Sequence, residues 1–359
     1  MKYYSLKNIL ERNAVYNVIF GERSNGKSFA VHEYALKGYA ERGEQLALIR
    51  REDVDFIGKR GAQMFDGIVN AGKVEKLTRG KWTGIYYRGR QWFLMRYDEN
   101  GNRVVDNKPF AFAFALSSME HDKSTEYPGV KTILFDEFIT RKPPLINEFE
   151  LFMNVLSTII RQRNDVKIFM LGNTVNRTCL YFSEMGLRHI SKMKPGDIDI
   201  YEYGKDNRLT VAVEYTAPNV KGKPSDFYFA FDNPRLNMVT RGGWELASYP
   251  HCPRKYKPKD VRFTFFIIFN YETLQCEIIK FDNAEFIFIH RKTTPLQDTE
   301  NDLIFSLDYD PRRNWRRDIT RPSDRVSQYI SYLFANDKVY YQDNDVGETV
   351  RNYLQWCRR

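Results

Sequence analysis

Short apolar runs alternate with polar turns and amphipathic stretches along the first half of the chain. Helically spaced apolar residues follow the first of these runs and recur over residues 148–160. Strands that alternate with helices predict a mostly parallel sheet, because each parallel connection needs a crossover. The apolar runs of strand length occupy residues 15–20, 45–49, 110–116, 132–135 and 166–171.

A second pattern interrupts this one between residues 80 and 116. Hydrophobic and polar residues alternate on both sides of Gly89 over residues 84–95. A further turn sequence follows at residues 99–102. We therefore predict a β-hairpin inserted before the strand at residues 110–116.

The carboxyl-terminal part of the chain has a different organisation. Periodicity fades and prolines accumulate over residues 201–256, which is typical of a linker or a small connecting subdomain. We predict a first domain at residues 1–200 and a second at residues 257–359. The elements expected in the second domain are strands at residues 262–269, 276–281 and 285–289 and amphipathic helices at residues 323–334 and 346–357.

The first predicted strand leads into a loop of the pattern G-x-x-x-x-G-K-[ST]. Gly21 and Gly26 let backbone N–H groups turn inward around phosphate oxygens, at the positive end of the helix that begins near Lys27. In this pattern the lysine reaches the β- and γ-phosphates of ATP, and the Ser28 hydroxyl holds Mg²⁺. The alternative is a glycine turn that arose by chance. The loop consists of Gly21, Glu22, Arg23, Ser24, Asn25, Gly26, Lys27 and Ser28.

The apolar run at residues 132–135 ends in two carboxylates, Asp136 and Glu137. This is the Walker B pattern, in which a buried strand brings acids to the edge of the sheet beside the phosphate loop. Asp136 is the candidate Mg²⁺ ligand, and Glu137 is the candidate base that orients and deprotonates the attacking water. Alternatively, the strand merely ends in acidic turn residues. The phosphate loop upstream favours the catalytic interpretation.

Two other predicted strands end in polar residues, and open α/β sheets bind ligands at the carboxyl ends of their strands. Asn173 follows the run at residues 166–171 and is a candidate γ-phosphate sensor or, alternatively, a turn asparagine. Arg50 and Arg51 follow the run at residues 45–49. They could contact nucleotide, a neighbouring subunit or only solvent.

Arg161 and Arg163 follow the helix predicted at residues 148–160. An arginine inserted beside the γ-phosphate of a neighbouring subunit accelerates hydrolysis by ~10³ to 10⁵. The alternative is favourable capping of the carboxyl end of the helix. Position alone favours capping.

Composition and charge narrow the class of protein. Apolar residues make up 42% of the 359, which is typical of a globular chain with a sizeable core. Ten basic residues against four acidic ones over residues 59–103 indicate either a polyanion-facing surface or an ordinary solvated face. The apolar runs are too short to span a bilayer, so we expect a cytosolic protein without a membrane partner.

With both motifs placed, the chain resembles the DNA packaging ATPases of small tailed bacteriophages of the phi29 type, which are relatives of the large terminases. The resemblance covers about half of the chain well and the carboxyl part only in outline. The segments that carry it are residues 17–28, 43–45, 49–51, 127–139 and 161–163.

The resemblance implies a P-loop ATPase of the additional-strand, catalytic-glutamate type with a mostly parallel sheet. It implies a pentameric ring that drives double-stranded DNA into an empty capsid with ATP and Mg²⁺, docked on the capsid portal in the host cytoplasm. Whether a scaffold RNA joins the motor stays open. Arg161 falls on the family's trans-acting arginine finger, with Arg163 as the neighbouring alternative.

The resemblance also implies a smaller α+β carboxyl domain of RNase H-like outline. In large terminases this domain is a nuclease that needs clustered acidic residues for two metals. Here the centre of the first strand lacks an aspartate, so we expect a non-cleaving domain that contacts DNA, RNA or capsid. The basic run at residues 311–317 is either a phosphate-backbone contact or a solvated loop. The acidic candidates are scattered: Asp260, Glu277, Asp282, Asp308 and Asp310.

Two other functions fit the same motifs. A RecA-like helicase or partition ATPase would act on DNA without a portal. A nucleotide-gated binding module would switch conformation without turnover. Glu137 beside Asp136 argues against the second, because a switch needs no catalytic base.

Overall fold

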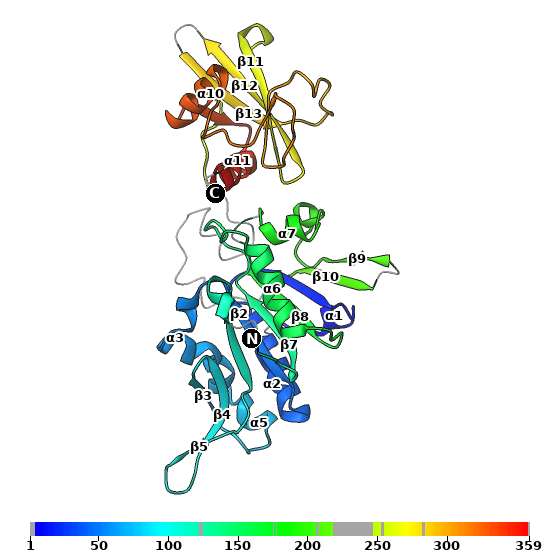
Figure 1. The fold of residues 1–359 in the computed structure, drawn as a ribbon, viewed down its shortest axis with the longest axis vertical. Coiled ribbons are helices and arrows are strands. Elements are labelled where there is room, and N and C mark those ends of the chain that lie inside the picture. Colours follow the sequence, from blue (N-terminus) through cyan, green and yellow to red (C-terminus); the bar gives the residue numbers. More distant parts are fainter. Residues whose placement is uncertain are drawn as a thin grey trace. The chain divides into compact units, whose positions relative to one another are not determined.

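The computed structural model describes residues 4–121, 125–174, 176, 178–205, 208–217, 247–252, 255–281 and 284–357. The chain forms two compact units, Met1–Glu245 and Leu246–Arg359. Each unit has its own sheet, as Figure 1 shows.

The parallel part of the first sheet consists of β1 (Tyr16–Gly21), β2 (Gln45–Arg50), β6 (Ala111–Ala115), β7 (Val130–Asp136), β8 (Lys167–Asn173) and β10 (Leu209–Tyr215). Their order across the sheet is β6-β2-β7-β8-β1-β10. Strand β8 therefore lies between β1, which leads into the phosphate loop, and β7, which carries the two carboxylates. This additional strand confirms the predicted fold class.

Antiparallel strands extend both edges of this sheet. The predicted hairpin consists of β3 (Gly84–Arg88), β4 (Gln91–Tyr97) and the short β5 (Arg103–Val105), and β4 pairs with β6. At the other edge, β9 (Ile198–Tyr203) pairs with β10. The helices of this unit are α1 (Lys7–Leu10), α2 (Lys27–Arg42), α3 (Lys59–Ala62), α4 (Asp66–Asn70), α5 (Lys73–Leu77), α6 (Glu148–Ile160) and α7 (Leu180–Glu184).

Helices on both faces of the sheet bury the parallel strands. Residues Val18 and Phe20 of β1 belong to the core that α6 covers, whereas Ile19 belongs to the core that α2 covers. This division follows from the period of two along a strand, which sends successive side chains to opposite faces. Helix α6 has the bounds that its apolar spacing predicted.

The predicted connecting segment at residues 201–256 differs from the structure at its beginning. The end of β9 and all of β10 belong to the first sheet, where β10 pairs with β1. Alternating Val211, Val213 and Tyr215 place one side of β10 in the core. The prolines that follow this strand obscured its pattern in the sequence. Residues 218–246, the centre of the predicted segment, lie outside the described residues.

The second unit has a six-stranded sheet with two longer helices. Its elements are β11 (Val261–Phe269), β12 (Glu272–Phe281), β13 (Ala284–Arg291), β14 (Ile304–Ser306), β15 (Trp315–Arg316), β16 (Val339–Tyr341), α10 (Arg325–Ala335) and α11 (Asn344–Cys357). The predicted three strands and two helices are present, with small shifts at their ends.

The strand order of this second sheet is β15-β14-β11-β12-β13-β16. Strands β11, β12 and β13 are antiparallel, and β14 and β15 continue parallel to β11. This order is that of an RNase H-like sheet, so the predicted outline is confirmed. Helices α10 and α11 share one core with a single face of the sheet. None of the described helices in either unit has both the length and the apolar character needed to cross a membrane.

A polar cluster lies on the opposite face of the second sheet, centred on Glu277. Its carboxylate accepts hydrogen bonds from Tyr256 at 2.5 Å and from Gln275 at 2.7 Å, and His290 lies 3.7 Å away. The interaction with His290, and then the two hydrogen bonds, lower the pKa of Glu277 to about 2. The same carboxylate raises the pKa of His290.

We predict that Glu277→Gln destabilises the second unit in a pH-dependent way. Because folding lowers the pKa of Glu277, this carboxylate stabilises the folded state at pH values above the ordinary pKa of a glutamate. Because folding raises the pKa of His290, the stability that this residue contributes is lost as the pH rises through its raised pKa. The thermal midpoint of the variant should therefore fall further below wild type at about pH 5.5 than at about pH 9. Tyr256→Phe, which leaves the ion pair intact, is the matched control and should show a pH-independent loss. An equal loss for Glu277→Gln at both pH values would refute the ion pair.

Candidate nucleotide-binding site

The phosphate loop is a tight turn between β1 and α2. Gly21 and Gly26 have positive φ values of 151° and 93°, and α2 begins at the next residue, Lys27. A Cβ at Gly21 would lie 2.1 Å from the Thr216 hydroxyl oxygen, so a side chain does not fit there. Glycine at both positions thus allows the loop to close against β10 and to present its backbone to the pocket.

Lys27 is buried, with 5% of its surface exposed. Its Nζ donates to the Glu22 carbonyl at 2.6 Å, to Asn25 Oδ1 at 3.3 Å and to Asn173 Oδ1 at 3.4 Å. Burial lowers the pKa of Lys27 to about 8, against the opposing attraction of Asp136. All three hydrogen-bond partners are neutral oxygens, so the described residues leave the charge of this ammonium group available to an anion in the pocket.

The two acidic residues of the Walker B pattern differ in burial but share one cation. Asp136 is buried, and the Ser28 hydroxyl donates to its two carboxylate oxygens at 3.2 and 3.3 Å. The Glu137 side chain is 63% exposed, and its backbone is left-handed with φ of 62°. Arg50 at the end of β2 binds both acids, at 2.9 Å from Asp136 Oδ2 and 2.6 Å from Glu137 Oε2. Sequence reasoning found all these residues but not this shared ion pair.

Asn173 is the last residue of β8 and pairs with Gly21 of β1 in the sheet register. Its side chain reaches Lys27 from the strand that separates the phosphate loop from Asp136. The candidate sensor thus lies between the two motifs and lines the same pocket.

These elements surround a pocket of about 670 Å³. Backbone and side chains of the phosphate loop form one wall, and the ends of β7 and β8 with the residues after β7 form the other. The exposed residues Arg23 and Ser24 lie in its lining. The lining residues are Arg23, Ser24, Asn25, Gly26, Lys27, Ser28, Phe29, Arg51, Asp136, Glu137, Ile139, Thr140, Arg141, Leu171, Gly172 and Asn173.

Arg51 has a buried partner that sequence reasoning missed. Its guanidinium group forms two hydrogen bonds of 2.8 Å with Glu148, the first residue of α6. Glu148 also accepts from the Tyr181 hydroxyl at 2.9 Å and from the Leu145 backbone at 2.7 Å. The only sign of this contact in the sequence was that Glu148 is a carboxylate at the amino end of a predicted helix, where a negative charge is favourable. Arg51 therefore connects the pocket wall to α6.

Thr216 is a second residue that sequence reasoning missed. It follows β10, accepts a hydrogen bond from Asn25 Nδ2 at 2.9 Å and donates its backbone N–H to the Phe20 carbonyl. Asn25 in turn accepts from the Lys27 backbone and contacts Lys27 Nζ. Because Thr216 lies in the segment predicted as a linker, no local pattern in the sequence connected it to the phosphate loop.

Arg161 and Arg163 do not reach this pocket. Both follow α6 and lie near the amino end of β7, at the opposite edge of the sheet. Arg163 donates to five backbone carbonyls, including Ile159 and Ile160 at the end of α6. The capping alternative therefore describes Arg163. Arg161 is exposed, with its guanidinium group 3.3 Å from the Thr125 carbonyl and 3.8 Å from Glu126.

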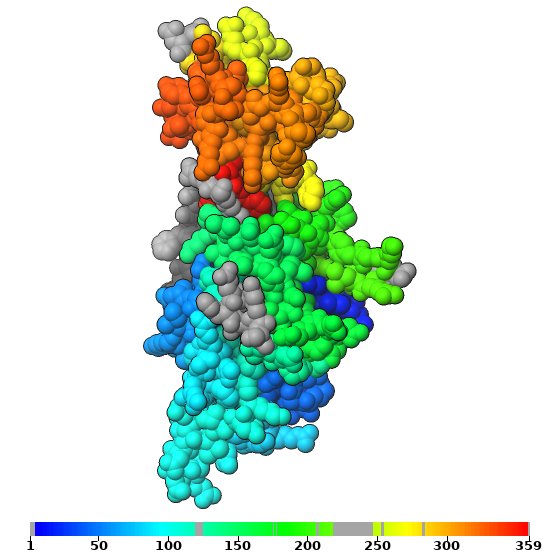
Figure 2. All heavy atoms as spheres, viewed as in Figure 1, coloured from blue at the N-terminus to red at the C-terminus, as the bar shows by residue number. Residues whose placement is uncertain are grey.

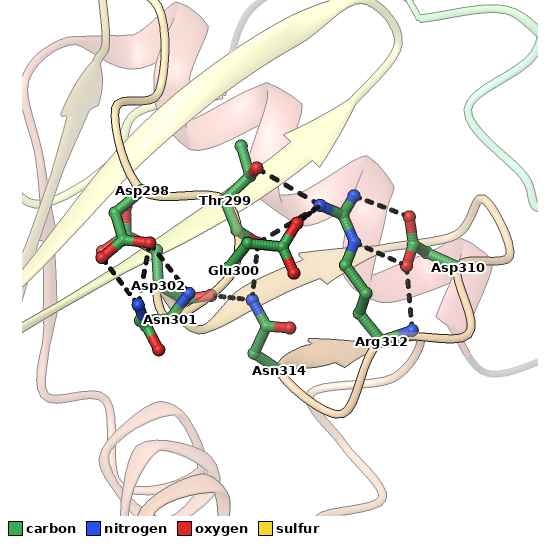
Figure 3. A network of polar contacts seen from close by, with 8 residues as sticks. All are labelled: Asp298, Thr299, Glu300, Asn301, Asp302, Asp310, Arg312 and Asn314. Atoms are coloured by element: carbon green, nitrogen blue, oxygen red, sulfur yellow. Dashed lines mark hydrogen bonds and ion pairs between the residues drawn. The ribbon is translucent and has the colours of Figure 1, made fainter.

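The basic run of the second unit is partly neutralised within that unit. Arg312 pairs with Asp310 at 2.8 Å and with Glu300 at 3.0 Å (Figure 3). Its guanidinium group also lies over the Trp315 ring. Arg316 pairs with Asp324 at 3.3 Å. These ion pairs weaken the case for a phosphate contact by the run as a whole.

The acidic candidates of the second unit have separate surroundings. Glu277 belongs to the polar cluster described above, Asp310 pairs with Arg312, and Asp260 caps the turn before β11. Asp282 lies outside the described residues. In the part of the chain that the structure describes, no three His, Cys, Asp or Glu side chains are grouped to hold a metal ion.

The strand order and the pocket together define a P-loop protein of the additional-strand, catalytic-glutamate class. Residues 1–194 match the family model of the Podovirus DNA encapsidation protein (Gp16). The match covers more than half of the 359 residues, and the chain belongs to this family.

Individual relatives agree with this assignment. The DNA packaging protein of Bacillus phage phi29 is 27% identical over 183 residues, which are 50% of this chain and 49% of that protein. The chain thus spans about half the length of the curated relatives it matches.

Two solved assemblies have chains of the same fold. A chain of the phi-28 gp11 DNA packaging motor has a TM-score of 0.57 and 18% identity, and the match covers 99% of this chain and 98% of that one. A chain of the bacteriophage phi-29 viral genome packaging motor assembly has a TM-score of 0.55 and 19% identity, with 98% and 99% covered. At these identities the likeness concerns the fold of the two units.

We predict that Thr216→Val destabilises the first unit, because it removes the buried acceptor of the Asn25 amide at nearly constant volume. A buried donor left without a partner costs about 1–3 kcal/mol. Thr216→Ser keeps the hydroxyl and should retain most of that free energy of unfolding in a urea titration. A loss in Thr216→Ser with no loss in Thr216→Val would mean that the methyl group of Thr216, not its hydroxyl, supports the loop.

Proposed function

We propose that the chain is an ATP-hydrolysing motor subunit that moves double-stranded DNA into a preformed phage capsid. The observation that carries the proposal is the meeting of Lys27, Ser28, Asp136 and Glu137 in one pocket. The chain's membership of a DNA encapsidation family supplies the biological context.

The residues of the pocket suit a magnesium nucleotide. The Ser28 hydroxyl and the Asp136 carboxylate lie within 3.3 Å of each other and offer the hard oxygen ligands that Mg²⁺ prefers. The hydrogen bonds of Lys27 that the structure describes are all to neutral oxygens, so its ammonium group can bind the negatively charged triphosphate. Mg²⁺ held by Ser28 and Asp136 would supply charge neutralisation between the β- and γ-phosphate oxygens.

The remaining groups of the pocket have distinct roles in this mechanism. Backbone N–H groups of the loop and Lys27 bind the phosphates of ATP. Asn173 reports on the γ-phosphate from the end of β8. Glu137 orients the attacking water and accepts its proton, for which it must exchange its contact with Arg50 for one with water.

Arg161 acts on the pocket of a neighbouring copy of the chain. It follows α6 at the edge of the sheet opposite its own phosphate loop, and its side chain is 45% exposed. Arg163, whose donors are occupied by backbone carbonyls, holds the turn that presents Arg161. A ring of copies, with five as the expected number, brings each Arg161 to the next pocket.

The partners follow from the packaging role. Double-stranded DNA passes through the ring and is contacted at its phosphates, without sequence preference and with strong salt dependence. The motor works in the host cytoplasm on the portal of the procapsid, and a scaffold RNA is a further candidate partner. The second unit contacts DNA, RNA or capsid and does not cut DNA. We assign the motor role to residues 1–200 together with β10. The rest of residues 201–256 form the connecting segment, and residues 257–359 form the second domain.

We predict that Glu137→Gln binds ATP but loses hydrolysis by ~10²-fold or more, because it removes the general base. The measurement is phosphate release by the concentrated protein, with and without linear double-stranded DNA. Glu150→Gln, an exposed acid in the first turn of α6, is the matched control and should keep wild-type turnover. DNA-stimulated turnover that vanishes only in Glu137→Gln supports a motor. ATP binding without turnover in the wild-type ring on its procapsid would instead favour a nucleotide-gated switch.

We predict that Arg161→Ala retains ATP binding and loses turnover by ~10³-fold or more. Mixing Arg161→Ala with Glu137→Gln subunits should restore part of the activity, since some interfaces then combine an intact Arg161 with an intact Glu137. Arg12→Ala, an exposed arginine near the amino terminus, is the control for lost charge. Full hydrolysis by Arg161→Ala, or no recovery in mixed rings that do assemble, would reject the trans-acting role.

A further inference from the structure

The β3–β4–β5 extension has one face that packs on neither core of the first unit. Alternate residues Ile85, Tyr87, Trp92, Leu94 and Val104 pack in the core on the α2 side. The residues between them point to the other face of the sheet, where none of them belongs to a core cluster. We call this surface the outer face: Tyr86, Arg88, Gln91, Phe93, Met95, Tyr97, Arg103 and Val105.

Aromatic rings form a row on the outer face. Tyr86 of β3 is directly opposite Phe93 of β4, and both are half-buried. Tyr97 is opposite Arg103 of β5 and is 59% exposed. The Arg103 guanidinium group lies 3.9 Å from the centroid of the Tyr86 ring, so a planar cation already stacks on this face.

The charged residues within the three strands are all basic, whereas the turn between β4 and β5 contains Asp98 and Glu99. Strands β3, β4 and β5 contain Arg88, Arg96 and Arg103 but no aspartate or glutamate. Among the described residues, Arg88 and Arg103 form no ion pair with a carboxylate, whereas Arg96 interacts electrostatically with Asp98. By contrast, the nearby Arg90 pairs with Asp53 outside the strands. Space-filling atoms show the extension, in cyan, as a lobe at one end of the first unit (Figure 2).

We propose that the outer face binds a single-stranded nucleic acid. Bases stack on Phe93 and Tyr97, and Arg88 and Arg103, whose guanidinium group lies over the Tyr86 ring, bind the phosphates between them. Aromatic rings that are exposed or half-buried on an antiparallel sheet are suited to unpaired bases, because the bases of a duplex offer their faces only to one another. The absence of carboxylates from the three strands fits a polyanion, whereas a second copy of this chain would have to supply acids to these arginines.

This binding surface is separate from the nucleotide pocket. No residue of β3, β4 or β5 lines that pocket. The inference therefore stands or falls independently of ATP hydrolysis, and it is distinct from the passage of double-stranded DNA through a ring.

Fluorescence anisotropy with the full chain tests the proposal. The probes are labelled oligo(U) and oligo(dT) of about 20 nucleotides and a duplex of equal length, titrated over a range of salt concentrations. The ring variant is Phe93→Leu with Tyr97→Leu, which keeps apolar volume and removes two stacking surfaces. Arg88→Gln with Arg103→Gln removes the phosphate-binding groups. Arg96→Gln, on β4 between the strands of Arg88 and Arg103 but on the opposite face of the sheet, is the matched control.

We expect the ring variant to weaken single-strand binding by roughly 10- to 100-fold and to leave duplex binding unchanged. The double arginine variant should reduce the salt dependence of single-strand binding by about 1 in slope for each arginine replaced, and Arg96→Gln should not. A preference for oligo(U) over oligo(dT) would identify RNA as the ligand, and equal binding would indicate a ligand recognised by its bases alone. Thermal unfolding checks that each variant is folded; Tyr97→Leu alone, at the most exposed ring, serves if the double variant is not.

Three results would overturn the proposal. The wild-type chain fails to bind either single strand at low salt. The ring variant binds single strands as tightly as wild type. The variants change the mass of the assembly in sedimentation rather than its affinity for nucleic acid, in which case the outer face is an interface between copies of the chain.

Discussion

The position of β8 between β1 and β7 is the constraint on which the site depends. It separates the phosphate loop from the Walker B strand by one strand, and this spacing gives the pocket its width. Asn173 at the end of β8 fills the gap and contacts Lys27. Ser28 closes it from the other side by its hydrogen bonds with Asp136. The parallel direction of all three strands brings every one of these groups to the same edge of the sheet.

Helix α6 connects this edge to the opposite one. Its first residue, Glu148, is bound by Arg51 in the pocket wall, and Arg161 directly follows its last turn. Buried partners hold both ends, with Tyr181 at Glu148 and backbone carbonyls at Arg163. A change in the pocket that moves Arg51 would therefore move a rigid element rather than a loop. Helix α6 would thus transmit a change in one pocket to Arg161, which is proposed to act on the pocket of the neighbouring subunit.

Features set by neighbours in sequence could be predicted, and features set by distant residues could not. The phosphate loop, the Walker B strand and α6 follow from runs of fewer than 20 residues, so their patterns are legible. The Arg51–Glu148 and Asn25–Thr216 contacts join residues 97 and 191 positions apart, and no local pattern connects them. Strand β10 was missed because prolines follow it closely. Arg161 and Arg163 are the same residue type and differ in the groups that surround them in the folded chain. Those surroundings could not be predicted from the sequence.

The left-handed backbone at Glu137 has a consequence for how two adjacent acids can share one cation. Successive side chains of a strand point to opposite faces of the sheet, so an uninterrupted β7 would send Asp136 and Glu137 apart. The turn at φ of 62° ends the strand at that point and rotates the second carboxylate back toward Arg50. Such a conformation costs a residue with a Cβ about 1–2 kcal/mol. One unfavourable torsion angle thus converts a strand end into a pair of converging carboxylates.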